Sequence, residues 1–452
     1  MLATLRNAFK NPELRKRILY TIGILVVFRL GSCLILPFVD GRLVANATSV
    51  LTDSTSVFGM LNLFSGGAFS SATLFALSIS PYITAQIIIQ LLTVAIPPLE
   101  RLAKEGETGR KKLNRITKYV AILMAALQGF GYYTILRWQA YTMPDGTVYQ
   151  GVLIDAATSG WSQYLAAVVI VACLVAGACS VIWLGDRISE KGIGNGVSML
   201  LFAGILAGLP RNIEVLYETF MQGVRAMQNN EEGTLKIFLV PFILLVFAAM
   251  IVFIVIMTKG ERRIPVQYAK RVVGRKMYGG QSSYIPIKVN MSGVLPIIFA
   301  SSLLSLPATI IAFTNTQNAF WQGVAKWLSP ASWFYGILFF VLIIGFNYFY
   351  VAIQYNPVEI ANNIKNNNGA IPGIRPGKPT ATFIQKVLSK IVFIGAIFLG
   401  IIAVFPIIFN SATGVQVALG GTTIIIVVGV ALETMQQLES QIMMRHHKGF
   451  LE

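Results

Sequence analysis

The chain has 452 residues, of which 55% are hydrophobic and 12% are charged, and its formal net charge is +17. A soluble domain carries about a quarter charged residues, so this composition excludes an ordinary soluble globular protein. The charged residues cluster in a few stretches, separated by apolar runs close to the roughly 20 residues that span a bilayer. The sequence therefore predicts an all-α polytopic membrane protein.

Ten apolar runs are predicted to cross the membrane, and a shorter re-entrant piece at 60–74 precedes the second of them. The first run lacks a small-residue cleavage site, which predicts a retained span rather than a signal peptide. The fifth run is short, with about 15 apolar residues after Asn195 against the roughly 20 of a full crossing. The predicted spans are 18–38, 75–96, 116–137, 162–184, 195–210, 237–257, 290–313, 333–354, 383–406 and 417–436.

Arg29 is the only ionised side chain deep within one of these runs. A charge at that depth is costly unless it reaches the interface or a partner. No carboxylate lies at comparable depth in the other spans, so we expect an interior structural role for Arg29. The same lack argues against a proton- or ion-coupled carrier, which keeps carboxylates or histidines along its pathway.

The stretch 60–97 is apolar enough to enter a membrane but is interrupted. Gly66 and Gly67 break it, hydroxyl side chains follow, and Pro81 lies inside the continuous part. Such a segment is stable at membrane depth only where it is buried in protein or lines a water-filled cavity. The alternative is a kinked core helix of a large bundle.

The second predicted span carries a stripe whose polarity changes along its length. At 100° per residue, Ile79, Ile83, Gln86 and Gln90 fall within about 60° of one another. This pattern favours a water-filled funnel that narrows to an apolar constriction, a known gating device. Ser80 and Thr84 lie on a neighbouring face, where they could hydrogen-bond another helix. Core packing with incidental glutamines is the alternative.

The segment 185–196 reads GDRISEKGIGNG, whose glycines resemble a phosphate-binding loop. The spacing is GxGxG rather than GxGxxG, and a membrane span precedes it instead of a strand. We therefore predict a tight turn in which Asn195 caps the short fifth helix.

Basic residues are distributed very unevenly between alternate loops. Lys and Arg number 29 on the side of the N-terminus and 6 on the opposite side, with Arg29 inside the first span. Basic residues accumulate on the cytoplasmic side, so both termini are predicted to be cytoplasmic. Topology and anionic lipid are the simplest explanation of this charge.

Two cytoplasmic loops, 97–118 and 258–289, are too long and too patterned to be simple connectors. Alternating Ile, Pro, Val and Tyr in the second predict short strands or a hairpin, and its basic charge suits an acidic protein or ribosomal RNA. A third loop, 355–382, places glycines and prolines around Arg375, which predicts an ordered turn. Arg375 is either a contact residue or one more positive-inside charge.

The cysteines and histidines do not form a metal or catalytic pattern. Cys33, Cys173 and Cys179 all lie in apolar runs and are odd in number, so no disulfide framework or zinc spacing exists. The only histidines, His446 and His447, lie in the C-terminal tail. We expect no cofactor and no enzymatic activity.

Eight blocks of the chain, in order, resemble the SecY family of bacterial protein-conducting channels. The resemblance covers essentially the whole chain. The blocks are LNLFSGGAFS, SPYITAQIIIQLL, KEGETGRKKLNRITKY, ISEKGIGNGVSMLLFAGI, RRIPVQYAKR, GGQSSYIPIKVNMSGVLPIIFASS, NPVEIANNIKNNNGAIPGIRPGKPT and GGTTIIIVVGVALE.

This resemblance implies ten helices in two pseudo-symmetric halves of five, 1–210 and 211–452, with a re-entrant plug helix at about 61–73. It also implies a channel in the bacterial plasma membrane that passes unfolded secretory polypeptides and releases transmembrane segments sideways into lipid. SecA or a translating ribosome would drive transport. The other implied partners are SecE, SecG, signal sequences, nascent chains and anionic lipids.

The family's functional positions carry over onto this sequence residue by residue. The plug includes Phe64, Gly66 and Gly67. The pore ring is Ile79, Ile83, Leu201, Ile298 and Ile426, with Leu201 where isoleucine is common. The lateral gate includes Thr84, Ile87, Gln128 and Ser302. The surface for SecA or the ribosome includes Arg262, Arg263, Lys270, Arg271 and Arg375.

Two other classes of protein fit the sequence less well. A secondary transporter built on a broken helix predicts intramembrane charges and no large basic loops. An intramembrane hydrolase requires a GxSxG motif, an HExxH motif or a catalytic carboxylate pair, and the chain shows none of them.

Overall fold

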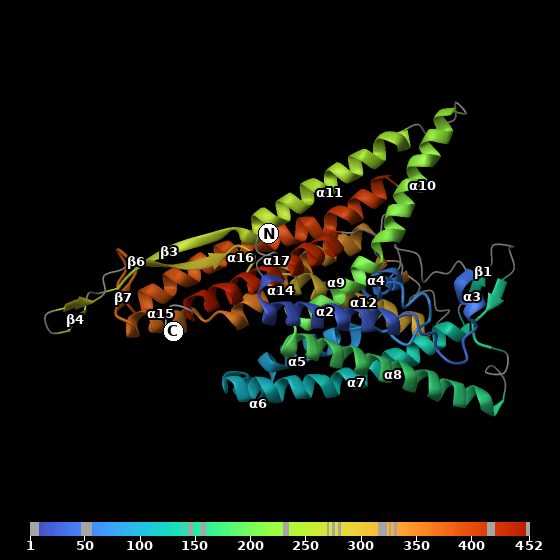
Figure 1. Ribbon diagram of the computed structural model, residues 1–452, viewed down its shortest axis with the longest axis horizontal. Helices are drawn as coiled ribbons and strands as arrows, with labels where there is room; N and C mark the ends of the chain where they lie inside the picture. The colour runs from blue at the N-terminus through green and yellow to red at the C-terminus, as the bar shows by residue number, and fades with distance from the viewer. Residues whose placement is uncertain are drawn as a thin grey trace.

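The protein is described by a computed structural model, in which most of the chain is helical (Figure 1). The structure describes residues 9–46, 57–138, 140–142, 148–154, 160–228, 235–268, 271–273, 276–278, 282–314, 323–324, 327–329, 332–413 and 421–448.

The helices before strand β3 are α2 Pro12–Gly31, α3 Gly41–Asn46, α4 Val57–Ser65, α5 Ser80–Ala95, α6 Pro97–Lys104, α7 Glu107–Trp138, α8 Trp161–Lys191, α9 Gly196–Ala207, α10 Leu209–Gln228 and α11 Leu235–Lys259. The later helices are α12 Leu295–Thr314, α14 Trp333–Gln354, α15 Pro357–Asn366, α16 Lys378–Thr413 and α17 Gly421–Lys448. The strands are β1 Ala140–Thr142, β2 Val148–Gln150, β3 Glu261–Tyr268, β4 Arg271–Val273, β5 Lys276–Tyr278, β6 Ser282–Lys288 and β7 Gly369–Ala370.

The described helices confirm a multi-pass membrane fold. Six helical segments are long and apolar enough to cross a bilayer, and α5 with α6, bent by 102°, makes a seventh. The other three predicted spans fall on α2, α12 and α17, so each predicted span coincides with a helix. The boundary proposed between residues 210 and 211 lies within α10 and stays a prediction.

The second span begins later than its hydropathy predicts. Residues 66–79 form consecutive turns, and helix α5 starts only at Ser80, with Pro81 in its first turn. The expectation that Pro81 interrupts a continuous helix is therefore wrong. Proline lacks a backbone N–H and has a fixed φ, which suits the first turn of a helix better than its interior.

Several helices extend into stretches that were predicted as loops. Helix α6 and the start of α7 occupy most of 97–118, α8 continues to Lys191, and α10 follows α9 after Gly208. The turn before α9 is correspondingly short. As predicted, the Asn195 side chain caps α9 by accepting a hydrogen bond from the Val197 N–H at 3.1 Å.

The predicted strands of 258–289 are confirmed. Strand β3 pairs antiparallel with β6 along its length and with β7 at its end, in the order β6-β3-β7. Strands β4 and β5 form a separate hairpin beyond this sheet, at the far left of Figure 1. The sheet has its own apolar core, in which Ile264, Val266 and Ile287 pack with residues of α15 and α16.

The largest hydrophobic cluster joins helices from early and late in the chain. It takes buried residues from α2, α5, α8, α9, α11, α12, α14, α16 and α17. Helix α12 packs directly against α5 and α7, far from it in sequence. This cluster therefore holds the elements that carry the predicted pore ring.

Candidate functional site

The predicted ring residues all belong to this cluster. Ile79 lies just before α5, Ile83 on α5, Leu201 on α9, Ile298 on α12 and Ile426 on α17. All of them belong to the same buried cluster, and none is more than 5% exposed. The predicted ring residues thus come from four parts of the chain and are all buried in one apolar cluster.

The predicted plug, 61–73, begins within helix α4, which ends just before Gly66. Gly66 has φ +65°, in the left-handed region that favours glycine. The Gly67 N–H donates to the Asn62 carbonyl at 3.0 Å, and the Gly66 N–H donates to the Leu63 carbonyl at 3.2 Å. These bonds form a Schellman motif, in which glycine stops the helix and satisfies its last carbonyls.

Hydroxyl groups stabilise the turns that follow α4. The Ser65 hydroxyl donates to the Asn62 carbonyl at 3.0 Å and accepts from the Phe69 N–H at 3.0 Å. The Thr73 hydroxyl donates to the Ala68 carbonyl, and the Tyr132 hydroxyl of α7 donates to the Phe69 carbonyl. Polar groups that looked misplaced in an apolar run therefore satisfy the backbone of a non-helical segment.

Arg29 is exposed in the structure, so the predicted interior position is wrong, but its guanidinium makes a structural contact with a backbone group. Its Nη1 donates to the Gly66 carbonyl at 2.8 Å, which joins the last turn of α2 to the end of α4. Sequence reasoning missed this partner, because a backbone carbonyl leaves no signature in composition.

The predicted gate residues lie on three helices that are in contact. Thr84 and Ile87 are buried on α5, while Gln128 of α7 and Ser302 of α12 are half-buried. The Thr84 hydroxyl donates to the Ser80 carbonyl of its own helix at 3.1 Å, and the Ser302 carbonyl accepts from Ser305 at 2.8 Å. The role of these residues in a gate stays a prediction.

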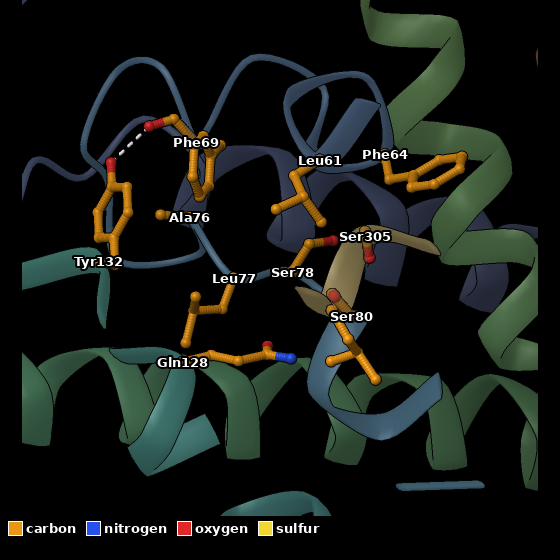
Figure 2. Close-up of a pocket in the computed structure, with 11 residues that line it drawn as sticks. Leu61, Phe64, Phe69, Ala76, Leu77, Ser78, Ser80, Gln128, Tyr132 and Ser305 are labelled. Atoms are coloured by element: carbon orange, nitrogen blue, oxygen red, sulfur yellow. Dashed lines mark hydrogen bonds between the residues drawn. The ribbon is translucent and has the colours of Figure 1, made fainter. Parts of the chain in front are cut away.

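A cavity lies between the plug, α5, α7 and α12 (Figure 2). Its volume of ≈ 30 Å³ is enough for about two water molecules. Figure 2 shows Leu61 and Phe69 of the plug segment on one side, with Ser80 and Gln128 on the other. Ser78 and Ser305 were not singled out from the sequence, whereas Ser80 was predicted beside Thr84 on one face of the second span. Ser305 lies one helical turn after Ser302, so helical periodicity could have indicated it.

Three of the predicted docking arginines belong to the sheet unit. Arg262 and Arg263 lie on β3, and Arg375 lies in a turn after β7, where its carbonyl accepts a hydrogen bond from Thr380 at 2.9 Å. All three are exposed. Arg271 lies on β4, and Lys270 falls outside the described residues. The ordered turn predicted around Arg375 is confirmed.

Arg263 is oriented by two neighbours on the sheet surface. Its Nε donates to Glu261 Oε1 at 2.6 Å, and its guanidinium lies over the Tyr284 ring at 4.7 Å from the centroid. The hydrogen bond to Glu261 raises the pKa of Arg263 above its ordinary value, with a smaller effect from Tyr284. The group therefore presents a fixed positive charge.

The arrangement matches solved protein-conducting channels. It aligns with "The structure of a protein conducting channel" at a TM-score of 0.62 and 18% identity, over 94% of this chain and 92% of that one. It also aligns with "Sec61 in the Canine ribosome-channel complex from the endoplasmic reticulum" at a TM-score of 0.59 and 15% identity, with the same coverage. The fold is that of a multi-pass helical protein-conducting channel.

Sequence comparison then defines the family. A model of the SecY family matches residues 73–435. The protein translocase subunit SecY of Streptomyces coelicolor is 43% identical over the full length of both chains, and that of Corynebacterium glutamicum is 40% identical over 99% of both. The chain belongs to the SecY family, and it is therefore a channel subunit and not an enzyme.

Proposed function

We propose that the structure is a closed polypeptide channel whose seal is the apolar ring together with the plug. The observation that carries this proposal is the burial of Ile79, Ile83, Leu201, Ile298 and Ile426 in one cluster drawn from four elements. An apolar constriction hinders ions because water columns dewet there. It also offers an unfolded chain no strong binding site, which lets any sequence slide through.

Glutamines on the same stripe of α5 support a wet funnel on the side of the sheet unit. Gln86 and Gln90 are half-buried, and the carbonyl oxygen of Gln90 is buried with no hydrogen-bond partner in the described part of the chain. A buried amide oxygen requires a donor, which a change of the Gln90 rotamer towards water would supply. The exposed parts of Gln86 and Gln90 support a wet funnel between the ring and the cytoplasm.

The lateral exit lies between α5 and α12, with α7 and α14 beside them. A signal sequence would enter here by replacing the contacts of α12 with its own apolar surface. Hydrogen bonds between polar side chains of membrane helices are worth only about 0.6–2 kcal/mol each. Polar groups such as Thr84, Gln128 and Ser302 would therefore let the gate close without locking it.

The proposal extends to the side of the membrane on which the sheet unit lies and to the proteins that bind the channel. The sheet unit, with the exposed Arg262, Arg263 and Arg375, is the cytoplasmic docking surface for SecA or a ribosome, and both termini are cytoplasmic. SecE and SecG complete the complex in the bacterial plasma membrane. The halves 1–210 and 211–452 would separate at the gate when the channel opens. Among the similar structures, a yeast Ssh1 complex is bound to the 80S ribosome, which supports a ribosome as a partner.

Substitution of Ile298 tests the seal. Ile298→Asn places an amide in the ring, so it should raise resting ion conductance by on the order of tenfold and let signal-defective precursors pass. Ile298→Leu keeps the ring apolar and should behave as the parent chain. Conductance and precursor export that do not differ between the two variants would exclude Ile298 from the seal.

A further inference from the structure

Arg29 lies where three segments distant in sequence meet. It occupies the last turn of α2, and its Nη1 donates to the Gly66 carbonyl at 2.8 Å. No acidic residue is paired with it among the salt bridges of the described residues. An arginine in a membrane span is costly to keep, so a specific acceptor for it is informative.

The acceptor belongs to the terminus of the plug helix. Gly66 is the left-handed residue of the Schellman motif that ends α4, so its carbonyl lies at the negative end of the helix dipole. A cation at this end is stabilising, and a charge-assisted hydrogen bond is stronger than a neutral one. Arg29 therefore acts as a side-chain cap that comes from a different helix.

The same end of the plug is wedged against α9. A Cβ atom on Gly66 would lie 2.7 Å from the Gly204 carbonyl oxygen and 3.2 Å from Arg29 Nη1. A Cβ atom on Gly204 would lie 2.4 Å from the Phe64 carbonyl oxygen. The backbones of α4 and α9 thus touch directly, and Arg29 secures the plug from the side of α2.

We propose that Arg29 is a positioning residue that holds the plug helix in the closed channel. This inference rests on the proposed seal. It identifies the Arg29 guanidinium as the group that stabilises the plug in its closed position. When the plug leaves, Arg29 loses the Gly66 carbonyl and the Gly66–Gly204 contact opens. Removing Arg29 should therefore shift the plug towards the displaced position without changing the ring.

Plug position can be measured independently of transport. In the complete translocon in lipid, with the native cysteines replaced by serine, a cysteine replaces the buried Ala68 in the plug segment. Its labelling by a membrane-impermeant maleimide from the outer side reports plug displacement. Arg29→Met should raise the labelling rate about tenfold, which corresponds to about 1.4 kcal/mol, and Arg29→Lys should raise it less. Arg17→Met, at the other end of α2, is the matched control and should leave the rate unchanged.

Two further variants test whether Arg29 acts on the plug helix or whether its loss perturbs the whole channel. Gly204→Ala keeps the charge but disturbs the same contact from α9, so it should also raise labelling. In channels lacking residues 57–65, Arg29→Met should add nothing to the resting conductance. Labelling unaffected by Arg29→Met, or an equal conductance increase with and without the plug helix, would overturn the inference. Unchanged conductance on deletion of 57–65 alone would instead count against the plug as a seal.

Discussion

At the scale of single residues, one glycine and one proline determine the structure on either side of the proposed plug. Gly204 has no side chain at the point where α9 meets the end of α4, which lets the two backbones touch. Pro81 starts α5 immediately after the turns, so the gate helix begins where the plug segment ends. In the proposed opening, displacement of the plug therefore does not require α5 to unwind.

Arg375 is the residue whose charge is most directly testable. It is exposed in a turn braced by the Thr380 hydroxyl, so Arg375→Glu should not disturb folding. Reversing a charge at a docking surface weakens association, and ATP-driven export of a precursor should fall about tenfold. Lys365→Glu, at the end of α15, makes the same charge change on an exposed residue of the same unit. Equal export by both variants would remove Arg375 from the docking surface.

At the scale of elements, the sheet of β6, β3 and β7 has its own apolar core, separate from that of the membrane bundle. Its inward residues alternate along β3, with Ile264 and Val266 buried and Pro265 and Gln267 exposed. Such alternation marks a strand with one buried face. The unit therefore needs its own core to present the arginines in a fixed position.

Val266→Asp tests this core. An unpaired carboxylate buried in the apolar core of the sheet should cost about 3 kcal/mol or more, so protease should cleave 258–289 at least about tenfold faster. Gln267→Asp places the same charge on the exposed face and should leave the cleavage rate unchanged. The membrane helices should keep their thermal stability in both variants. Equal protease resistance of the two variants would show that β3 is not anchored by this face.

Elements that depend on local patterns were predictable from the sequence. Alternation predicted the strands of 258–289, and the polar cap predicted the start of α9 at Asn195. The ends of the helices were not predictable, because hydropathy marks the boundary of the lipid and not the end of a helix. Helices α8 and α10 continue beyond that boundary into polar sequence. The partner of Arg29 and the contact of Gly66 with Gly204 join segments far apart in the chain, so no local pattern contains them.

At the scale of the whole molecule, charge and burial divide the chain between two tasks. The bundle is apolar and joined by one cluster that crosses from α2 to α17. Most of the 36 basic residues lie in the loops and termini on the side of the N-terminus, which includes the sheet unit. The proposed path for a polypeptide leads from this basic side through the ring, while α12 can separate from α5 towards lipid.

Crosslinking from the ring tests this path most directly. Cysteine replaces Ile83 in a chain without native cysteines, and a secretory precursor carrying a single cysteine is stalled during export. We predict a disulfide between position 83 and the precursor, whereas cysteine at Leu127, exposed on α7, should give none. A precursor shown by protease protection to be engaged, yet never crosslinked to position 83, would contradict passage through the ring.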